Sequence, residues 1–547
     1  MTARRLRAPA DDGGLLIDPP WSELRDLTGS NAGRLSSWDY NVQGREASRL
    51  RVQARREVTQ LARAFLRRHG LSEPSPVDDV DRPLIVTGHQ PELFHPGVWV
   101  KNFAAANLAR SAGGVALNLI VDNDIPKAAG IRVPTVVAGG LRTMPVDFDE
   151  SQGELPYEDW KVADEGMFAS FGTRARETLA DAVADPLIDD FWPRAMRRRD
   201  DVDTIGLRFS LARREIEAAW GFHNLELPLG RVCQTDSFLW FASHLLAQLP
   251  RYQQIHNACL DDYRAAHHIR SRHHPVAALA RQDDWLEAPF WIWRASSPRR
   301  RALLARRSGR TVDLRIAGES DFLASLPLPL DGEACCAVER LRDLPAQAAR
   351  LRTRALTTTM FARYFLGDLF IHGIGGARYD ELGDEISRRF FESEPPGFLA
   401  LSLTLRLGIP SGPESSDDLH AVDTALRDLI FNPDRHLDEP YPDELRNIIE
   451  AKRAALAAPV TTRGERIART HALRRCNLLM QPWVDAKREG LRSRRQAILA
   501  GLRSNRIARN REFAAVLHSS GRLREILGGV GSRSVEGSRP SAPLTGG

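Results

Sequence analysis

Two histidines in one short loop are the residues of this chain best suited to acid–base chemistry. His89 and His95 lie between an apolar run at residues 84–86 and a stretch of helical apolar spacing at residues 99–108. A loop that opens onto a helix N-terminus attracts phosphate or carboxylate, because backbone N–H groups are unpaired there. Since imidazole transfers protons near neutral pH, we predict catalytic roles for both histidines; the alternative is that they cap the turn. The neighbours that we assign to cofactor binding are Thr87, Gly88, Gln90 and Gly97, and Lys101 is assigned to the substrate.

The same loop carries part of a nucleotide-binding signature. It is neither a Walker loop nor a GxGxxG loop. The run His95-Pro96-Gly97 matches the first three positions of the HxGH-type signature of nucleotidyltransferases and class I aminoacyl-tRNA synthetases. Val98 stands where those families have their second histidine. Nucleotidyl transfer by that route is therefore not the leading interpretation.

Two aspartates follow the next apolar run, at residues 115–121. Asp122 and Asp124 form a DxD pattern at an expected strand end. Such carboxylates bind Mg²⁺ or Mn²⁺ on a nucleotide diphosphate, because hard cations prefer oxygen ligands. They can equally contact a polar substrate, and Asp124 can cap the following turn. We assign both aspartates to the catalytic group, keep Mg²⁺ as a candidate cofactor and predict no residue set dedicated to a metal.

A glycine-rich loop at residues 372–376 follows a second apolar run and precedes a helical pattern. Glycines in such a place let a ligand approach the backbone, although a tight turn alone is the alternative. The residues assigned to cofactor binding are His372, Gly373, Gly375, Gly376 and Tyr379, and Asp380 is assigned to the substrate.

A third group, at residues 256–274, combines histidines with arginines. Zinc requires neutral imidazoles in tetrahedral reach, which neighbouring arginines oppose, so we find no evidence for zinc. Guanidinium groups bind phosphate or carboxylate through paired hydrogen bonds. We interpret the group as an anion site, with Asn257, Arg270 and His273 assigned to the substrate; a solvated basic helix is the alternative.

The elements that must position these loops form a βαβ crossover over residues 84–121. This pattern predicts a parallel sheet with ligands at the carboxyl ends of its strands. We predict an α/β fold: a Rossmann-like (HUP-like) parallel sheet core, a largely helical insertion, and a C-terminal helical hairpin or coiled coil. The expected boundaries are an N-terminal irregular segment with an amphipathic helix at 1–80, core halves at 81–146 and 331–410, the insertion at 147–330, the helical region at 411–529 and a disordered tail at 530–547.

Composition favours a cytoplasmic protein without membrane spans. No stretch approaches the roughly 20 apolar residues of a membrane helix, and the five cysteines include no CxxC pair. The formal net charge is +5, yet residues 463–529 hold 16 Lys and Arg against 5 Asp and Glu. Because this basic region lacks interleaved aromatic residues, we interpret it as a solvated helix face and do not expect nucleic acid as a partner.

Two motifs together resemble a known family. The early run Val-Thr-Gly-His-Gln and the late run Leu-Phe-Ile-His-Gly-Ile-Gly-Gly-Ala-Arg-Tyr are similar to the TGQQ-type and GGPGE-type loops of the bacillithiol-biosynthesis cysteine-adding enzymes (BshC). The acidic strand end at residues 122–124 and the apolar run at 400–406 match in order. Three departures are visible: His89 replaces a glutamine, Asn123 interrupts the acidic run, and the late loop lacks Pro-Gly-Glu.

The resemblance implies a Rossmann-like core with inserted connecting domains and a C-terminal coiled coil that dimerises. It implies a ligase-like enzyme that joins an amino acid to the amine of a glucosaminyl conjugate, with ATP or another nucleotide as a candidate cofactor. We predict a small-molecule substrate and a homodimer through the C-terminal helices. The alternatives are a nucleotide-sugar or nucleotidyl transferase that uses Asp122 and Asp124 with a divalent cation, and a non-catalytic binding protein with basic C-terminal helices.

Overall fold

The computed structural model describes residues 6–74, 81–138, 140–271 and 273–531, and the chain divides into two compact units. Unit 1 comprises residues 1–133, 145–407 and 511–547, and unit 2 comprises residues 134–144 and 408–510. Most of the tail predicted at 530–547 lies outside the described residues. Among the described residues, no helix is long and apolar enough to cross a membrane.

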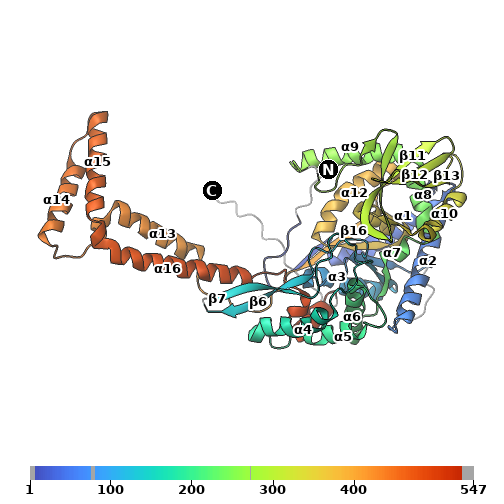
Figure 1. Ribbon diagram of the computed structural model, residues 1–547, viewed down its shortest axis with the longest axis horizontal. Coiled ribbons are helices and arrows are strands. Elements are labelled where there is room, and N and C mark those ends of the chain that lie inside the picture. Colours follow the sequence, from blue (N-terminus) through green and yellow to red (C-terminus); the bar gives the residue numbers. More distant parts are fainter. Residues whose placement is uncertain (1–5, 75–80, 139, 272, 532–547) are drawn as a thin grey trace. The chain divides into compact units, whose positions relative to one another are not determined.

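A six-stranded sheet forms the centre of unit 1 (Figure 1). Five of its strands are parallel, which confirms an α/β fold with a parallel-containing central sheet. The chain runs outward from β4 in one direction and later outward from β15 in the other, so a topological switch point lies between these two neighbours. In spatial order the strands are β1 (Leu15–Asp18, antiparallel), β16 (Phe398–Leu403), β15 (Leu369–His372), β4 (Leu84–His89), β5 (Val115–Ile120) and β8 (Leu225–Pro228).

Helices cover the sheet because their apolar faces must be buried. Helix α3 (Pro96–Ala112) joins β4 to β5, and α12 (Ile374–Phe391) joins β15 to β16. Since parallel crossovers are right-handed and these two run in opposite directions, the helices cover opposite faces. The predicted amphipathic helix is α2 (Ala47–Arg68), which buries Leu50, Ala54, Val58, Ala62 and Leu66.

The region at 147–330 is not the largely helical insertion that we predicted. It contains α4 (Glu165–Leu179), α5 (Ile188–Arg197), α6 (Ile205–Ala219), α7 (Leu229–Val232), α8 (Asp236–Ala247) and α9 (Leu249–Ala266), but also β8 of the central sheet. Its second half forms most of an antiparallel sheet. The strands are β9 (Arg281–Gln282), β10 (Trp285–Arg294), β11 (Ser297–Ser308), β12 (Thr311–Ile316) and β13 (Phe322–Pro327), joined by β14 (Ala349–Thr353) beside β10. Along β12 the polar residues Thr311, Asp313 and Arg315 alternate with buried apolar residues, a period of two that a reading of local charge misses.

Residues 6–44 are likewise more regular than predicted. Besides β1 they form helix α1 (Leu24–Ser36). Strand β1 pairs with β16, almost 400 residues away, so its partner cannot be recognised from neighbouring residues.

Unit 2 is helical, as expected for this part of the chain. Helix α13 (Ser416–Phe431) lies along α16 (Gln481–Ala508), and α14 (Asp443–Ala457) lies along α15 (Arg463–Leu479) (Figure 1). The tip of the hairpin β6–β7 (Gly130–Val137, Gly140–Asp147) also belongs to this unit, where the backbone N–H of Leu141 donates to Ser504 Oγ at 3.0 Å. The predicted helical region at 411–529 ends early, because the last helix, α17 (Ser520–Gly528), belongs to unit 1.

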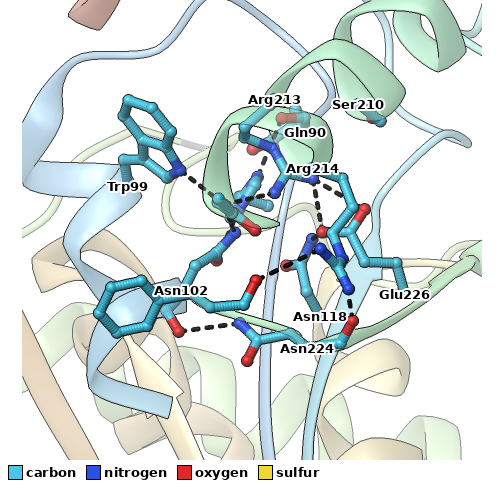
Figure 2. A network of polar contacts seen from close by, with 12 residues as sticks. Gln90, Trp99, Asn102, Asn118, Ser210, Arg213, Arg214, Asn224 and Glu226 are labelled. Atoms are coloured by element: carbon cyan, nitrogen blue, oxygen red, sulfur yellow. Dashed lines mark hydrogen bonds and ion pairs between the residues drawn. The ribbon is translucent and has the colours of Figure 1, made fainter. Parts of the chain in front are cut away.

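A buried ionic network ties the helices to the central sheet (Figure 2). The Arg213 guanidinium of α6 contacts Glu217 at 2.7 Å and Glu226 of β8 at 2.7 Å. Glu217 also accepts hydrogen bonds from Trp99 Nε1 at 2.6 Å and Asn102 Nδ2 at 2.8 Å, both on α3. Arg213 is at most 5% exposed, so one cation compensates two carboxylates in the interior.

Replacing Arg213 by Met should destabilise unit 1. The substitution leaves two buried carboxylates without their cation, which should lower the free energy of unfolding by about 3–5 kcal/mol. Chemical denaturation followed by circular dichroism measures this. Arg197→Met is the matched control, because Arg197 is 61% exposed in its ion pair with Glu215 and should cost less than about 1 kcal/mol. Equal losses for the two variants would refute the role of the network.

Candidate functional site

Two short segments meet at the carboxyl edge of the central sheet. Residues 122–124 follow β5, and residues 352–354 end β14; the Asn123 side chain donates to the carbonyl oxygen of Thr353 at 2.8 Å. Neither segment continues as a regular strand here, since residues 122–124 form a turn after β5 and Arg354 is the N-cap of helix α11 (Ala355–Phe361). Asp122 and Arg352 line a cavity of about 710 Å³, which we call the first cavity, whereas Asp124 and Arg354 line a second cavity of about 320 Å³.

The first cavity contains a carboxyl pair held by one arginine. Asp122 Oδ1 accepts the backbone N–H of Gly230 at 2.8 Å. The buried Arg352 guanidinium donates to both oxygens of Glu158, through Nε at 2.8 Å and a terminal nitrogen at 2.8 Å. A Cβ on residue 230 would lie 3.1 Å from Asp122 Oδ2 and 3.1 Å from Glu158 Oε2. Glycine at this position therefore allows both carboxyl groups to approach the α7 backbone.

Burial makes the Asp122 carboxyl a weaker acid than an exposed aspartate. Loss of solvent raises the pKa of its carboxyl, and the neighbouring Glu158 carboxylate raises it further, to about 7; Arg352 and the Gly230 N–H partly oppose these effects. A group with this pKa both accepts and donates a proton at neutral pH, which is what general acid–base catalysis requires.

A second arginine of β14 extends this polar wall. Arg350 contacts Asp159 at 2.6 Å, and Trp293 Nε1 donates to the same carboxylate at 3.0 Å. Burial raises the pKa of Asp159, which Arg350 opposes. Besides apolar side chains of α2 and α6, including Leu61, Phe65 and Leu207, the first cavity is lined by carboxyl and guanidinium groups in equal number. These are Asp122, Glu158, Asp201 and Asp203, and Arg68, Arg231, Arg350 and Arg352.

The two predicted catalytic histidines line neither cavity. His89 is 6% exposed, and its Nε2 lies 3.1 Å from Asn102 Oδ1, next to the buried network. Burial, with Lys101 and Arg213 nearby, holds the pKa of His89 well below its ordinary value. His95 is the N-cap of α3, where its Nδ1 accepts the Gly97 N–H at 3.1 Å; burial lowers its pKa to about 4. The geometry of His95 is that of the turn-capping alternative.

The other residues of the early loop divide between the interior and the second cavity. The Thr87 hydroxyl donates to the Ile371 carbonyl at 3.1 Å, which links β4 to β15. Lys101 is 5% exposed and donates to the Gly88 carbonyl at 2.9 Å; burial lowers its pKa to about 8. Gln90 lines the second cavity and donates to Asp124 at 2.9 Å.

The late glycine loop surrounds a buried histidine–aspartate pair. His372 Nε2 lies 2.7 Å from Asp380, which also contacts Arg363 at 2.7 Å and accepts from Thr359 at 2.7 Å. Burial lowers the pKa of His372. A Cβ at Gly373 or Gly375 would meet no atom within 4 Å, so that face of the loop is open, whereas one at Gly376 would approach His372 to 2.8 Å. Tyr379 is partly buried beside the core of unit 1.

The histidine and arginine group contributes one side chain to the second cavity, His256. Asn257 instead holds a loop, since it donates to the Leu279 carbonyl at 3.0 Å and accepts from its N–H at 2.9 Å. Arg270 and His273 are exposed. None of the three residues that we assigned to the substrate here lines either cavity.

Several cavity residues were missed by sequence reasoning. The arginines at 350, 352 and 354 are spaced by two residues, and in a strand this spacing places side chains on one face. The pattern could have identified Arg350 and Arg352 of β14, which both line the first cavity. The missed residues are Glu158, Tyr252, Trp291, Arg300, Arg350, Arg352 and Arg354.

Asp122 and Asp124 line different cavities, so the two aspartates do not share a position for a bound ion. In the described parts of the chain, no group of three or more His, Cys, Asp or Glu side chains could hold a metal ion. In sequence comparisons, no protein-family model and no curated protein matches this chain.

The raised pKa of Asp122 predicts a pH-dependent stability effect. A carboxyl with a raised pKa in the folded state costs free energy once it ionises, fully above about pH 7 and not at all below its ordinary pKa near 4. Asp122→Asn, which mimics the protonated form, should therefore raise the free energy of unfolding by roughly 2 kcal/mol at pH 8 and by less than half of that at pH 5. Denaturation at both pH values measures this.

Glu154→Gln is the control for that measurement, because Glu154 is 63% exposed in its ion pair with Arg299. It should change stability by less than about 1 kcal/mol at either pH. A destabilising Asp122→Asn, or an effect independent of pH, would contradict the raised pKa.

Proposed function

We propose that this protein is a ligase-like enzyme that forms a carbon–nitrogen bond in the first cavity. The observation that carries the proposal is Asp122, a proton-exchanging carboxyl on a cavity of about 710 Å³ at the carboxyl edge of a parallel sheet. An amine that attacks an acyl carbon must lose a proton as the bond forms. The Asp122 carboxylate is the acceptor for that proton, and Arg352 holds Glu158 beside it.

The order of the central sheet supports the class of fold that we inferred. Two halves wind outward from β4 and β15, as in Rossmann-like nucleotide-binding folds. The similarity of the two loops to those of the cysteine-adding enzymes points to the same chemistry. An amino acid and the amine of a glucosaminyl conjugate are therefore the proposed substrates.

A buried cation at the switch point supports a phosphate-bearing cofactor. The hydrogen-bond partner of Lys101 is the Gly88 carbonyl, and among the described residues no carboxylate forms an ion pair with Lys101. The start of α12, which no side chain caps, adds backbone N–H groups at the same edge. Lys101 and the open loop at Gly373 and Gly375 would hold the phosphates. A bound nucleoside triphosphate supplies the activation that a carboxylate needs before an amine can displace its oxygen.

An assay of product formation tests this function. Purified protein would be incubated with ATP, Mg²⁺, single amino acids and a glucosaminyl conjugate with a free amine, and new amides would be detected by mass spectrometry. Asp122→Asn should lower kcat by about 100-fold or more, because the proton acceptor is lost. The kcat/KM of the unaltered protein should rise with pH through about 7, as Asp122 ionises.

Glu154→Gln again serves as the exposed control and should retain the activity of the unaltered protein. Calorimetric titration with ATP and with the amine adds an independent measurement. Absence of both product and binding would refute the enzyme hypothesis, and full activity of Asp122→Asn would refute the assigned base.

We also propose that unit 2 mediates homodimerisation. Helix α15 spans 17 residues, yet none of them is buried. A helix of this length depends on packing for its stability, and its contact with α14 leaves all of its residues at least partly exposed, so we infer a further partner. The large apolar side chains that residues 408–510 of unit 2 expose are Ile430, Phe431, Leu456, Ile467, Leu478, Leu479 and Trp483.

Size-exclusion chromatography with light scattering measures the oligomeric state. The unaltered protein should have twice the mass of the 61.1 kDa chain. The double substitution Leu478→Glu with Leu479→Glu should shift it to the monomer, because dimerisation would bury the two new carboxylates. Leu330→Glu is the control, since Leu330 is 60% exposed in unit 1. A monomeric unaltered protein would contradict this proposal.

A further inference from the structure

The second cavity is built from side chains that the proposed reaction does not use. It lies at the ends of β4 and β5, beside β10, β14 and α9, and holds about 320 Å³, enough for a small organic molecule. Its apolar wall comes from Val276, Leu279, Pro289 and Leu356. A ligand with an apolar body fits this wall, because burial of its surface is favourable.

Two guanidinium groups converge on one indole at the cavity. Arg354 lies 4.1 Å from the ring centroid of Trp291, and Arg300 lies 5.1 Å from it. Each arginine has one carboxylate partner: Arg300 contacts Asp124 at 3.0 Å, and Arg354 contacts Glu287 at 2.6 Å. Glu287 does not line the cavity. Both arginines are thus paired, but only one of the two carboxylates lines the cavity, so the wall itself presents two guanidinium groups and one carboxylate.

Four buried polar atoms of the lining residues have no hydrogen-bond partner: Tyr252 Oη, His256 Nδ1, Arg300 Nε and Arg354 Nε. Tyr252 is fully buried and His256 is 4% exposed. The hydroxyl and the two guanidinium N–H groups are donors. His256 is neutral, because burial lowers its pKa to about 4, and its Nε2 faces the Ala277 carbonyl at 3.4 Å, so Nδ1 is an acceptor. Since buried polar groups are normally paired, this concentration around one cavity points to a ligand.

We propose that the second cavity binds a small monocarboxylic acid with an apolar or aromatic body. A ligand carboxylate in this cavity faces two guanidinium groups and only one carboxylate. A carboxylate accepts from several donors at once, and guanidinium is the side chain best matched to it. The apolar part of the acid packs against the wall opposite the arginines. His256 Nδ1 accepts from a hydroxyl or amine elsewhere on the acid, which favours acids that carry one such donor.

Isothermal titration calorimetry of the full chain tests the proposal with matched pairs of probes. Benzoate, 4-hydroxybenzoate, phenylacetate and isovalerate should bind, and benzamide and phenylacetamide should bind at least tenfold more weakly because they lack the charge. The 4-hydroxyl should strengthen binding relative to benzoate, and the gain should disappear in His256→Phe. Equal affinities for acids and amides, or no binding by any of the acids, would overturn the proposal.

Substitutions identify the position of binding. Arg354→Met should weaken binding of the acids at least tenfold, whereas Arg299→Met should leave it unchanged, because Arg299 is 67% exposed and pairs with Glu154. Circular dichroism melting verifies that each variant is folded, and Tyr252→Phe, which keeps the ring, provides a second variant expected to weaken binding. An affinity unaffected by both Arg354→Met and Tyr252→Phe would place the acid elsewhere. Tighter binding of phenyl phosphate than of benzoate would contradict a site for a monoanion.

Binding of acids in the second cavity does not depend on the proposed reaction in the first. Asp122 lines the other cavity, so Asp122→Asn should leave the affinity for the acids within twofold. Loss of turnover in that variant with retained binding separates the two sites. Loss of acid binding in Asp122→Asn would show that the cavities do not act separately and would overturn the assignment.

Discussion

The hydrogen bond from Asn123 to the Thr353 carbonyl is the contact on which the arrangement of the site depends. It joins the carboxyl end of the central sheet to the last strand of the antiparallel sheet. Asp122 and Arg352 line the first cavity, and Asp124 and Arg354, each two residues further along the chain, line the second. The residues that flank this one hydrogen bond therefore contribute to both cavities.

Buried charges in unit 1 are compensated in two distinct ways. Arg213 and Arg352 each contact carboxylates closely, and such pairs repay the cost of desolvation only when their geometry is good. Lys101 instead relies on a backbone carbonyl, with no carboxylate partner among the described residues. The negative charge of Asp122 is compensated only in part, because Gly230 and Arg352 do not fully offset the effects of burial and of Glu158 on its pKa. The incompletely compensated groups lie at the carboxyl edge of the sheet, where ligands of such folds bind.

The early histidines illustrate how a chemically suitable residue can serve the fold. His89 contacts Asn102, which in turn donates to Glu217 of the buried network, and His95 caps the helix that carries both Trp99 and Asn102. Imidazole is a polar group that can be neutral in the interior, so burial lowers its pKa and keeps it uncharged. Both histidines thus contact helix α3, His89 through Asn102 and His95 as its N-cap.

Local sequence patterns were sufficient for the βαβ unit at 84–121, the amphipathic helix α2, the helical nature of unit 2 and the position of Asp122 at the end of a strand. Apolar periodicity and strand ends are properties of neighbouring residues, so a local pattern reveals them. The pairing of β1 with β16, the antiparallel sheet within 147–330 and the partners of Asp122 were decided only by the tertiary structure. Glu158 and Arg352 are 194 residues apart in sequence. The raised pKa of Asp122 arises from burial and from the nearby Glu158 carboxylate, and Arg352 partly opposes both effects. None of these effects is encoded in the residues next to Asp122 in the sequence.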